Sequence, residues 1–179
     1  MDPKFRVLMA NPSRDICIAA IANGAQAHEP IQIRVTGGRA TPSTIAVPAG
    51  TKLVFENFDP FPHRLFQKDP VNAAWKPENI AGGAHREWTA PSGSGKFEFR
   101  DEASPSLRFW VVVEPGVADA TFPGRDGAFA FAQLQPGDYL LRAFFQGKPV
   151  SKAVSVSLKD KQTLELKEPL NVGEGGDAK

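Results

Sequence analysis

The stretch from Thr44 to Phe66 constrains the fold of this chain more than any other. Apolar residues alternate with polar or small ones on both sides of the tripeptide Pro48-Ala49-Gly50. This period of two is typical of half-buried strands. Proline fixes φ and glycine adopts conformations that other residues avoid, so the tripeptide predicts a tight turn. The pattern therefore predicts a strand, a turn and a second strand, with the alternating residues Ile45, Val47, Leu53 and Phe55.

An aromatic, proline-rich loop follows the second strand and presents one histidine. Asn57 to Pro62 contains two Phe and two Pro, and His63 comes next. The simplest interpretation is that His63 hydrogen-bonds to a backbone carbonyl or a carboxylate at the end of a β-sandwich. The alternative is that His63 joins His85 or His28 on a zinc or copper ion.

The same alternation recurs along the chain, and no segment shows a convincing helical period of 3.6 residues. The run from Phe109 to Val113 is apolar on both faces, as expected of a central strand. From Ala128 to Leu166 short apolar segments follow one another at hairpin spacing, which indicates a small antiparallel sandwich. We therefore predict an all-β protein, with further strands at Lys4–Met9, Ile16–Ala22, Ile31–Val35, Arg86–Ala90, Lys96–Arg100, Tyr139–Phe145 and Val154–Leu158.

Composition excludes several classes of function. The 179 residues suffice for one large domain or two small ones, and the formal net charge of +1 indicates neither a nucleic acid nor an anionic lipid partner. The single Cys17 excludes an internal disulfide and a cysteine-based zinc cluster. No apolar run approaches the length of a membrane span, and we expect Ile16–Ala22 to be a strand rather than a signal peptide. No nucleophile elbow or phosphate loop is present, so we do not expect an enzyme.

Two stretches resemble known families. The region from Ile31 to Val113 is similar to cupredoxins of the plastocyanin or methylamine-utilisation type. The residues that carry the resemblance are IAVPAGT from Ile45, Leu53-Val54-Phe55, Asn57, Asp59, His63 and the late strand ending at Trp110–Val113. The members of that family are periplasmic. Phe122 to Val156 resembles the carboxypeptidase regulatory segment, a transthyretin-like sandwich. The implied fold is a cupredoxin-like Greek-key sandwich followed by a small transthyretin-like β-sandwich. We expect N-terminal strands in 1–30 that pack on either sandwich, a cupredoxin-like domain in 31–115, a second β domain in 116–168 and a flexible tail in 169–179.

The copper site of the resembled family does not carry over. In that family the first histidine ligand matches His63, and a cysteine, a second histidine and a methionine come from the loop between the last two strands. Here that loop, Arg100 to Arg108, contains none of these three residue types. A blue-copper centre depends on the soft thiolate, so we expect no copper and no other cofactor. Arg100, Asp101 and Glu102 form either a charge-assisted network in place of the metal bonds or a solvated turn.

These observations predict a metal-free interaction module rather than a redox carrier. We expect an accessory subunit of a larger bacterial envelope complex, respiratory or photosynthetic, in a periplasmic or other extracytoplasmic location, with protein partners. The alternatives are an electron-transfer or metal-binding cupredoxin with an atypical site at His63, and a cell-surface module that binds carbohydrate or protein. Aromatic residues and arginine dominate interface hot spots, and aromatic residues in or beside the long loops also cap sandwich cores. The candidate partner-binding residues are Phe61, His63, Arg64, Phe66, Trp75, Arg86 and Trp88.

Overall fold

The protein is almost entirely β, as predicted. The computed structural model describes residues 11–24, 29–68, 75–132, 134–160 and 162–172. A single turn of helix, α1 (Pro12–Asp15), precedes the strands. The strands are β1 (Ile16–Ile21), β2 (Ile31–Thr36), β3 (Arg39–Thr41), β4 (Thr44–Val47), β5 (Lys52–Asn57), β6 (His63–Gln67), β7 (Glu78–Ile80), β8 (His85–Thr89), β9 (Gly95–Asp101), β10 (Arg108–Val113), β11 (Val117–Thr121), β12 (Gly137–Phe145), β13 (Lys148–Pro149) and β14 (Val154–Leu158).

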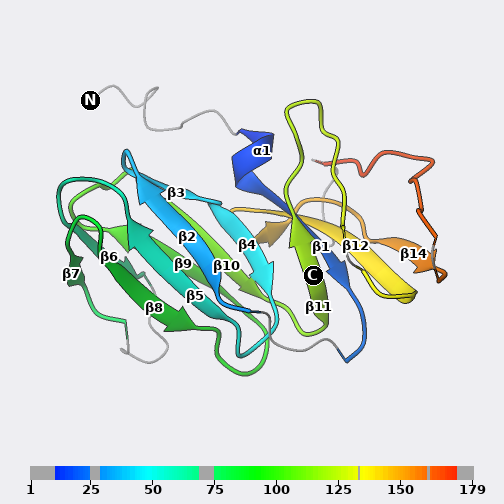
Figure 1. Ribbon diagram of the computed structural model, residues 1–179, viewed down its shortest axis with the longest axis horizontal. Helices are drawn as coiled ribbons and strands as arrows, with labels where there is room; N and C mark the ends of the chain where they lie inside the picture. The colour runs from blue at the N-terminus through cyan, green and yellow to red at the C-terminus, as the bar shows by residue number, and fades with distance from the viewer. Residues whose placement is uncertain (1–10, 25–28, 69–74, 133, 161, 173–179) are drawn as a thin grey trace.

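Two of the sheets face each other and form a sandwich (Figure 1). The four-stranded sandwich sheet has the order β3-β2-β5-β8, and the five-stranded sandwich sheet has the order β4-β10-β9-β6-β7. Phe55 on β5 contacts Phe99 on β9 and Phe109 on β10, with ring centroids 5.3 Å apart in both pairs. All three rings are buried, and the alternation of β5 predicts this for Phe55. The sandwich core is therefore an aromatic cluster held between the two sheets.

A third sheet contains the C-terminal strands and, at its centre, the strand that begins the described chain. Its order is β11-β1-β12-β13, and β14 also pairs with β12. We call it the C-terminal sheet. The antiparallel register of β1 and β12 runs from Ile16 opposite Phe145 to Ile21 opposite Leu140. The N-terminal strand β1 thus joins the C-terminal sheet, which leaves residues 31–113 to build the sandwich.

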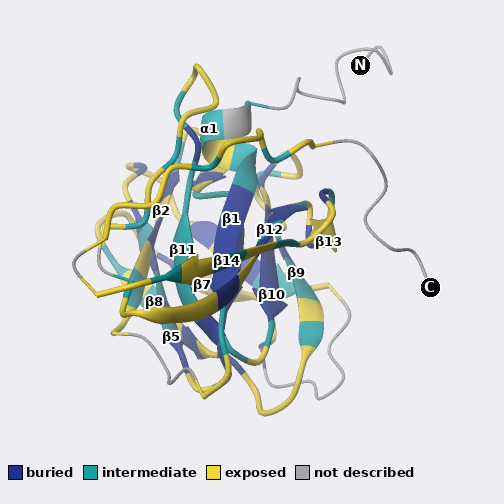
Figure 2. Ribbon diagram, turned by 90° about the vertical axis from the view of Figure 1, so that its right-hand side faces the viewer, coloured by how far each residue is buried: buried dark blue, intermediate teal, exposed yellow. Residues whose placement is uncertain are grey.

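The C-terminal sheet covers the outer side of the sandwich beside β4 and β10. The amide of Ala46 on β4 donates a hydrogen bond to Cys17 Sγ on β1, at 3.4 Å. At the tip of the β12–β13 hairpin, the amide of Gln146 donates to Thr44 Oγ1 at 3.1 Å. β10 is buried on both faces, as its sequence predicts. β1 is dark blue over most of its length in Figure 2, whereas intermediate and exposed residues alternate along the outer strand β14.

The structure differs from the sequence prediction in four places. His63 begins a strand, β6, instead of standing on a loop, because residues 65–67 pair with 99–101 of β9. The expected long loop after Gln67 contains β7 as well as β8. Residues 128–131 and 164–166 form no strand. The described residues of 116–168 supply strands to one sheet only, so the transthyretin-like sandwich is not confirmed.

Two expectations concern parts of the chain that the structure leaves undescribed. The predicted strand Lys4–Met9 and most of the expected flexible tail, from residue 173 onward, lie outside the described residues. Within the described ranges, no helix has the length and hydrophobicity of a membrane span.

Candidate functional site

The loop between β5 and β6 is shaped by the side chain of Asn57, the last residue of β5. Its Oδ1 accepts a hydrogen bond from the amide of Asp59 at 2.8 Å. Its Nδ2 donates to the carbonyl oxygens of Phe61 and Ile80, at 2.8 and 2.9 Å. An asparagine that satisfies backbone groups on both sides of a turn fixes its course without a regular ladder. Asn57 therefore sets where Asp59 and His63 lie.

The turn before β8 presses closely against this loop. A Cβ on Gly82 would lie 2.6 Å from the carbonyl oxygen of Asp59, which is backbone and cannot move aside. The next amide, of Gly83, donates to the carbonyl oxygen of Asn57 at 2.8 Å. Gly82 is thus required by the close approach of two backbones. The loop is packed between the strand end and this turn.

His63 lies fully buried between two carboxylates. Its exposed fraction is 0%, and its Nε2 is 2.9 Å from Oδ2 of Asp59, four residues earlier. Its Nδ1 makes a short hydrogen bond with Oδ2 of Asp101, the last residue of β9. Both ring nitrogens therefore have carboxylate partners from the same chain. The interpretation of His63 as a histidine hydrogen-bonded to a carboxylate is confirmed, with two carboxylates in place of one.

The two carboxylates are themselves hydrogen-bonded. Asp59 accepts from the amide of Gly37, at 2.9 and 2.8 Å to its two oxygens, and from Thr36 Oγ1 at 3.3 Å. Asp101 Oδ1 accepts from the amides of Arg64 and Ala103, at 2.8 and 2.9 Å. Among the described residues, no buried side-chain nitrogen or oxygen lacks a partner. Asp59, His63 and Asp101, which we call the Asp59–His63–Asp101 centre, thus form a closed polar network. Such a network tolerates burial because its polar groups have partners.

The pKa values of His63 and Asp59 are shifted in opposite directions. Burial disfavours the charged imidazole, but the hydrogen bonds and negative charges of Asp101 and Asp59 outweigh it and raise the pKa of His63. The Gly37 amide is the largest cause that lowers the pKa of Asp59, and the hydrogen bond from His63 adds to it against the effect of burial. The protonated ring and the ionised carboxylate therefore stabilise each other.

Arg100, Asp101 and Glu102 divide between the two interpretations made from the sequence. Asp101 belongs to the buried network. Glu102 forms an exposed ion pair with Arg64 at 2.7 Å, and Arg100 pairs with Glu98 at 2.7 Å. The hydrogen bond from Arg100 and the charges of Arg100 and Lys68 lower the pKa of Glu98, although burial acts in the opposite direction. One residue of the three thus belongs to a buried hydrogen-bond network, and the other two form ion pairs nearer the surface.

Of the seven candidate partner-binding residues, three lie in the interior. Trp75 and Trp88 belong to the sandwich core with Phe99, at centroid distances of 5.0 and 5.3 Å, and His63 is fully buried. Arg86 is half-buried: its guanidinium stacks on Trp75, 3.9 Å from the ring centroid, and burial lowers its pKa. Phe66 is also partly buried. Phe61 and Arg64 are the two candidates that the structure leaves exposed.

Phe58 extends the exposed surface around Phe61. The two phenylalanines flank Asp59 and Pro60 and are 47% and 46% exposed. The Arg34 guanidinium lies 4.2 Å from the centroid of the Phe58 ring. The Phe61 ring lies 5.1 Å from the His63 ring and covers it. We call Phe58, Phe61, Arg34 and Arg64 the aromatic-arginine surface.

The residues around His63 do not fit a blue-copper ion. Such a site needs a thiolate in the ligand plane, and the donors beside His63 are carboxylates. Cys17 lies on β1, in another sheet, where burial raises the pKa of its thiol to about 12 and the Ala46 amide bonds its sulfur. His85 lies on the outer strand β8 and His28 outside the described residues, and no cluster of metal-ligating side chains occurs within the described ranges.

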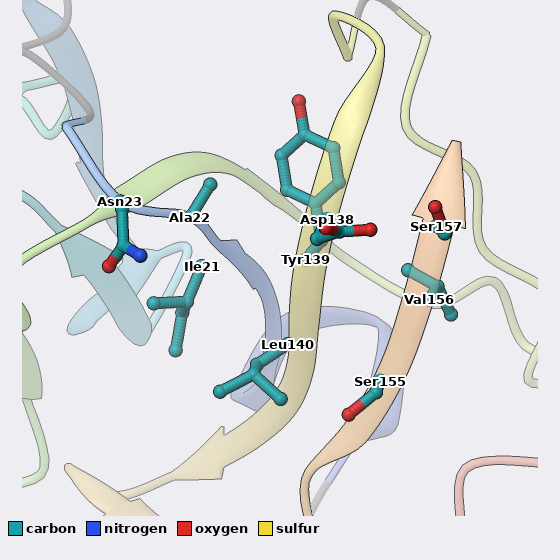
Figure 3. Close-up of a pocket in the computed structure, with 9 residues that line it drawn as sticks. All are labelled: Ile21, Ala22, Asn23, Asp138, Tyr139, Leu140, Ser155, Val156 and Ser157. Carbon is teal, nitrogen blue, oxygen red and sulfur yellow. The ribbon is translucent and has the colours of Figure 1, made fainter. Parts of the chain in front are cut away.

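A groove of about 410 Å³ lies elsewhere, on the C-terminal sheet (Figure 3). Its floor includes Ile21 and Leu140, with Ser155 and Ser157 of β14 on one side and Asn23 on the other. The groove contains no histidine and no cysteine. The groove therefore lies on the C-terminal sheet, whereas the buried His63 and its two carboxylate partners lie in the sandwich.

The comparisons with known proteins agree with the sandwich. The model of the cupredoxin-like domain family matches residues 9–113. The chain belongs to this family. The matched region includes β1 and all strands of the two sandwich sheets. No curated protein matches this cupredoxin-like chain significantly.

Solved structures similar to this cupredoxin-like protein include copper proteins. Amicyanin from Paracoccus versutus matches at 18% identity and a TM-score of 0.43, over 53% of this chain and 91% of its own. A purple cupredoxin from Nitrosopumilus maritimus matches at 24% identity and a TM-score of 0.41, over 47% and 99%. The Cu-containing nitrite reductase from Thermus scotoductus SA-01 matches at 20% and 0.43, over 53% and 25%. At these values the likeness carries no conclusion about this chain, and the family assignment rests on the family model.

Proposed function

We propose that this protein is a metal-free cupredoxin-like module that docks to another protein, as an accessory subunit of a bacterial envelope assembly. The observation that carries the proposal is the pairing of both His63 ring nitrogens with Asp59 and Asp101. A histidine binds a metal through an unprotonated nitrogen, and here both nitrogens are engaged. Electron transfer through a metal at this position would require the network to be dismantled.

The aromatic-arginine surface is the docking face in this proposal. Phe58 and Phe61 together present apolar area at one end of the sandwich, and Arg34 and Arg64 flank it. Exposed aromatics beside arginine are the composition of interface hot spots. An extracytoplasmic site of action is part of the proposal and derives from the resemblance to periplasmic cupredoxins.

The metal-free part is tested by metal analysis of the whole chain. The protein is produced with copper and, separately, with zinc in the medium and purified without chelators. We expect well below one metal ion per chain and no intense visible absorption. Stoichiometric copper that is lost in a His63→Gln variant would refute the proposal in favour of the electron-transfer alternative.

The docking part is tested by crosslinking in native envelope fractions, with a matched pair of variants. The double variant Phe58→Ser, Phe61→Ser removes the aromatic surface, whereas Leu140→Ser removes an equally exposed apolar side chain, 43% exposed, from the C-terminal sheet. We expect a defined crosslinked partner with the wild type and Leu140→Ser, and its loss in the double variant. Equal loss in both, or no defined partner, would refute docking at this surface.

A further inference from the structure

The Asp59–His63–Asp101 centre connects segments that belong to both sheets of the sandwich. Asp59 lies in the β5–β6 loop and bonds the turn between β2 and β3, through Thr36 and Gly37, on the four-stranded sheet. Asp101 ends β9 and bonds the amide of Ala103 on the loop that follows, on the five-stranded sheet. His63 lies between the two carboxylates. The only polar link from one carboxylate to the other that the described residues provide is thus this imidazole.

The hydrogen-bond partners fix where the protons are. Among the described residues, the other groups that hydrogen-bond to Asp59 or Asp101 are donors, namely four backbone amides and one hydroxyl. Both carboxylates therefore act as acceptors. A neutral imidazole has one N–H and one acceptor nitrogen, so one of its two contacts would place two acceptors face to face unless a carboxyl carried the proton, and an aspartic acid gives up its proton more readily than an imidazolium does. The geometry is satisfied when both ring nitrogens carry a proton.

We infer that His63 is held as a buried imidazolium and acts as an ionic clamp between the two sandwich sheets. The clamp fixes the turn at 36–38, the loop at 58–62 and the start of the loop after Asp101 in one arrangement. It does with protons what a metal ion does at the end of a metal-binding sandwich, because it joins ligands from separate segments at one point. For the docking face this inference rests on the proposed function: the clamp presets the positions of Phe58 and Phe61.

The charged groups on the surrounding elements do not replace either carboxylate. Arg64 on β6 and Glu102 after β9 pair with each other at the surface. On β7, which pairs with β6, Glu78 is exposed and lies 3.4 Å from Arg86 of β8. On β2 and β3, Arg34 stacks on Phe58 and Arg39 is exposed. We therefore expect the clamp to remain closed through the neutral range and to open when the carboxylates take up protons in acid.

The direct test is nitrogen-15 NMR of the imidazole rings in the isolated full chain. The His63 resonances are assigned in the wild type by through-bond correlation of the ring with its own backbone. We expect Nδ1 and Nε2 of His63 both to carry protons from pH 5 to pH 8. A His63 ring with one proton at pH 7 in the folded chain would overturn the inference, and this result needs no variant to fold.

Amide hydrogen exchange tests whether the ring clamps the loops. In Asp101→Asn we expect exchange of the Gly37 amide, which contacts only Asp59, to accelerate roughly tenfold or more because the link through His63 is weakened. Glu102→Gln, which alters the next residue and removes only a surface ion pair, is the matched control and should leave Gly37 unchanged. Unchanged exchange at Gly37 in Asp101→Asn, in a chain that folds, would show that the centre does not couple the sheets. Neither measurement involves a partner, so failure of docking leaves both results interpretable.

Discussion

The sandwich and the C-terminal sheet bury their cores in different ways. The sandwich closes two sheets over an aromatic cluster, whereas one face of the C-terminal sheet carries only the small buried core of Ala20, Tyr139 and Leu141. Segments without strands cover that core, through partly buried residues that include Phe131, Leu134 and Leu166.

The opposite face of the C-terminal sheet belongs to the sandwich core. Cys17, Ala19, Val117 and Phe144 lie in the same buried cluster as the aromatic residues of the sandwich. The sheet contributes one face to a shared core and keeps a weaker core of its own. The sandwich and the C-terminal sheet are therefore separate sheets on either side of a boundary near residue 115, but they share one buried hydrophobic core. We expect the two regions to unfold together for this reason.

The largest expected effect comes from the centre of the sandwich. Phe99 is fully buried and contacts Phe55, Trp75, Trp88 and Phe109, with centroids 5.0–6.0 Å apart. Phe99→Ala should lower the free energy of unfolding by about 3–5 kcal/mol, since it removes a large side chain from a packed cluster. Urea unfolding followed by tryptophan fluorescence and by circular dichroism checks it. The two probes should report one transition; separate transitions would show that the C-terminal sheet folds independently.

A smaller effect is expected from the C-terminal sheet's own core. Leu141 on β12 is 4% exposed, and its neighbour Leu140 points to the opposite face. Leu141→Ala should lower the free energy of unfolding by about 2–3 kcal/mol, less than Phe99→Ala because the covering segments can partly collapse into the space. Leu140→Ala is the control and should cost under about 1 kcal/mol. A cost for Leu141→Ala as large as that for Phe99→Ala would contradict the weaker packing.

The dependence of stability on pH separates the charged end of the sandwich from the rest of the fold. The raised pKa of His63 contributes stability below its unfolded value, about 6.5, and this is lost as pH rises through the folded value. The lowered pKa of Asp59 contributes stability above its unfolded value, about 3.9, and this is lost as pH falls through the folded value.

The stability difference between wild type and His63→Gln should therefore be greatest between about pH 4 and pH 6.5, and should shrink on both sides. Unfolding in urea at a series of pH values measures it. Leu141→Ala, which alters no titrating group, should give a difference that does not vary with pH. A difference for His63→Gln that is flat across the range would mean that the centre contributes no linked protons.

Strands with strict alternation could be predicted from the sequence, and strands defined by distant pairing could not. Residues 31–36, 52–57 and 154–158 show the period of two directly. By contrast, β6 has the mixed sequence HRLFQ and is a strand because it pairs with β9. The strands β3 and β7, with three residues each, offer too few residues for a periodic signal.

The sequence predicted that His63 is hydrogen-bonded to a backbone carbonyl or a carboxylate, but it did not identify both carboxylates that bond the ring. The lack of soft ligands in the loop from Arg100 to Arg108 left two interpretations of Arg100, Asp101 and Glu102, a charge-assisted network or a solvated turn. Of the three, Asp101, 38 residues from His63, bonds the ring. Asp59 escaped notice as a partner of His63 because the turn that brings it to Nε2 depends on Asn57 and on the backbone approach at Gly82. An Asn-x-Asp pair at the end of a strand, followed by a histidine, is the signal that would have found it.

The smallest expected effect measures the contact between the two regions. Gly147, at the tip of the β12–β13 hairpin, has φ of 71°, and a Cβ there would lie 2.5 Å from Lys96 Cδ and 3.3 Å from Trp110 Cδ1. Gly127 has φ of 83° and nothing within 4 Å of its Cβ. Both changes to Ala place a side chain in the left-handed region, at a cost of about 1–2 kcal/mol each.

The difference between Gly147→Ala and Gly127→Ala then isolates the packing of the hairpin on the sandwich. Because Lys96 is flexible and can move aside while the Trp110 ring is held, we expect Gly147→Ala to cost about 0.5–1 kcal/mol more. Thermal unfolding of the two variants under identical conditions checks this. Equal costs would mean that the hairpin tip does not press on the sandwich, and the shared core around Cys17 and Phe144 would then carry the whole connection between the regions.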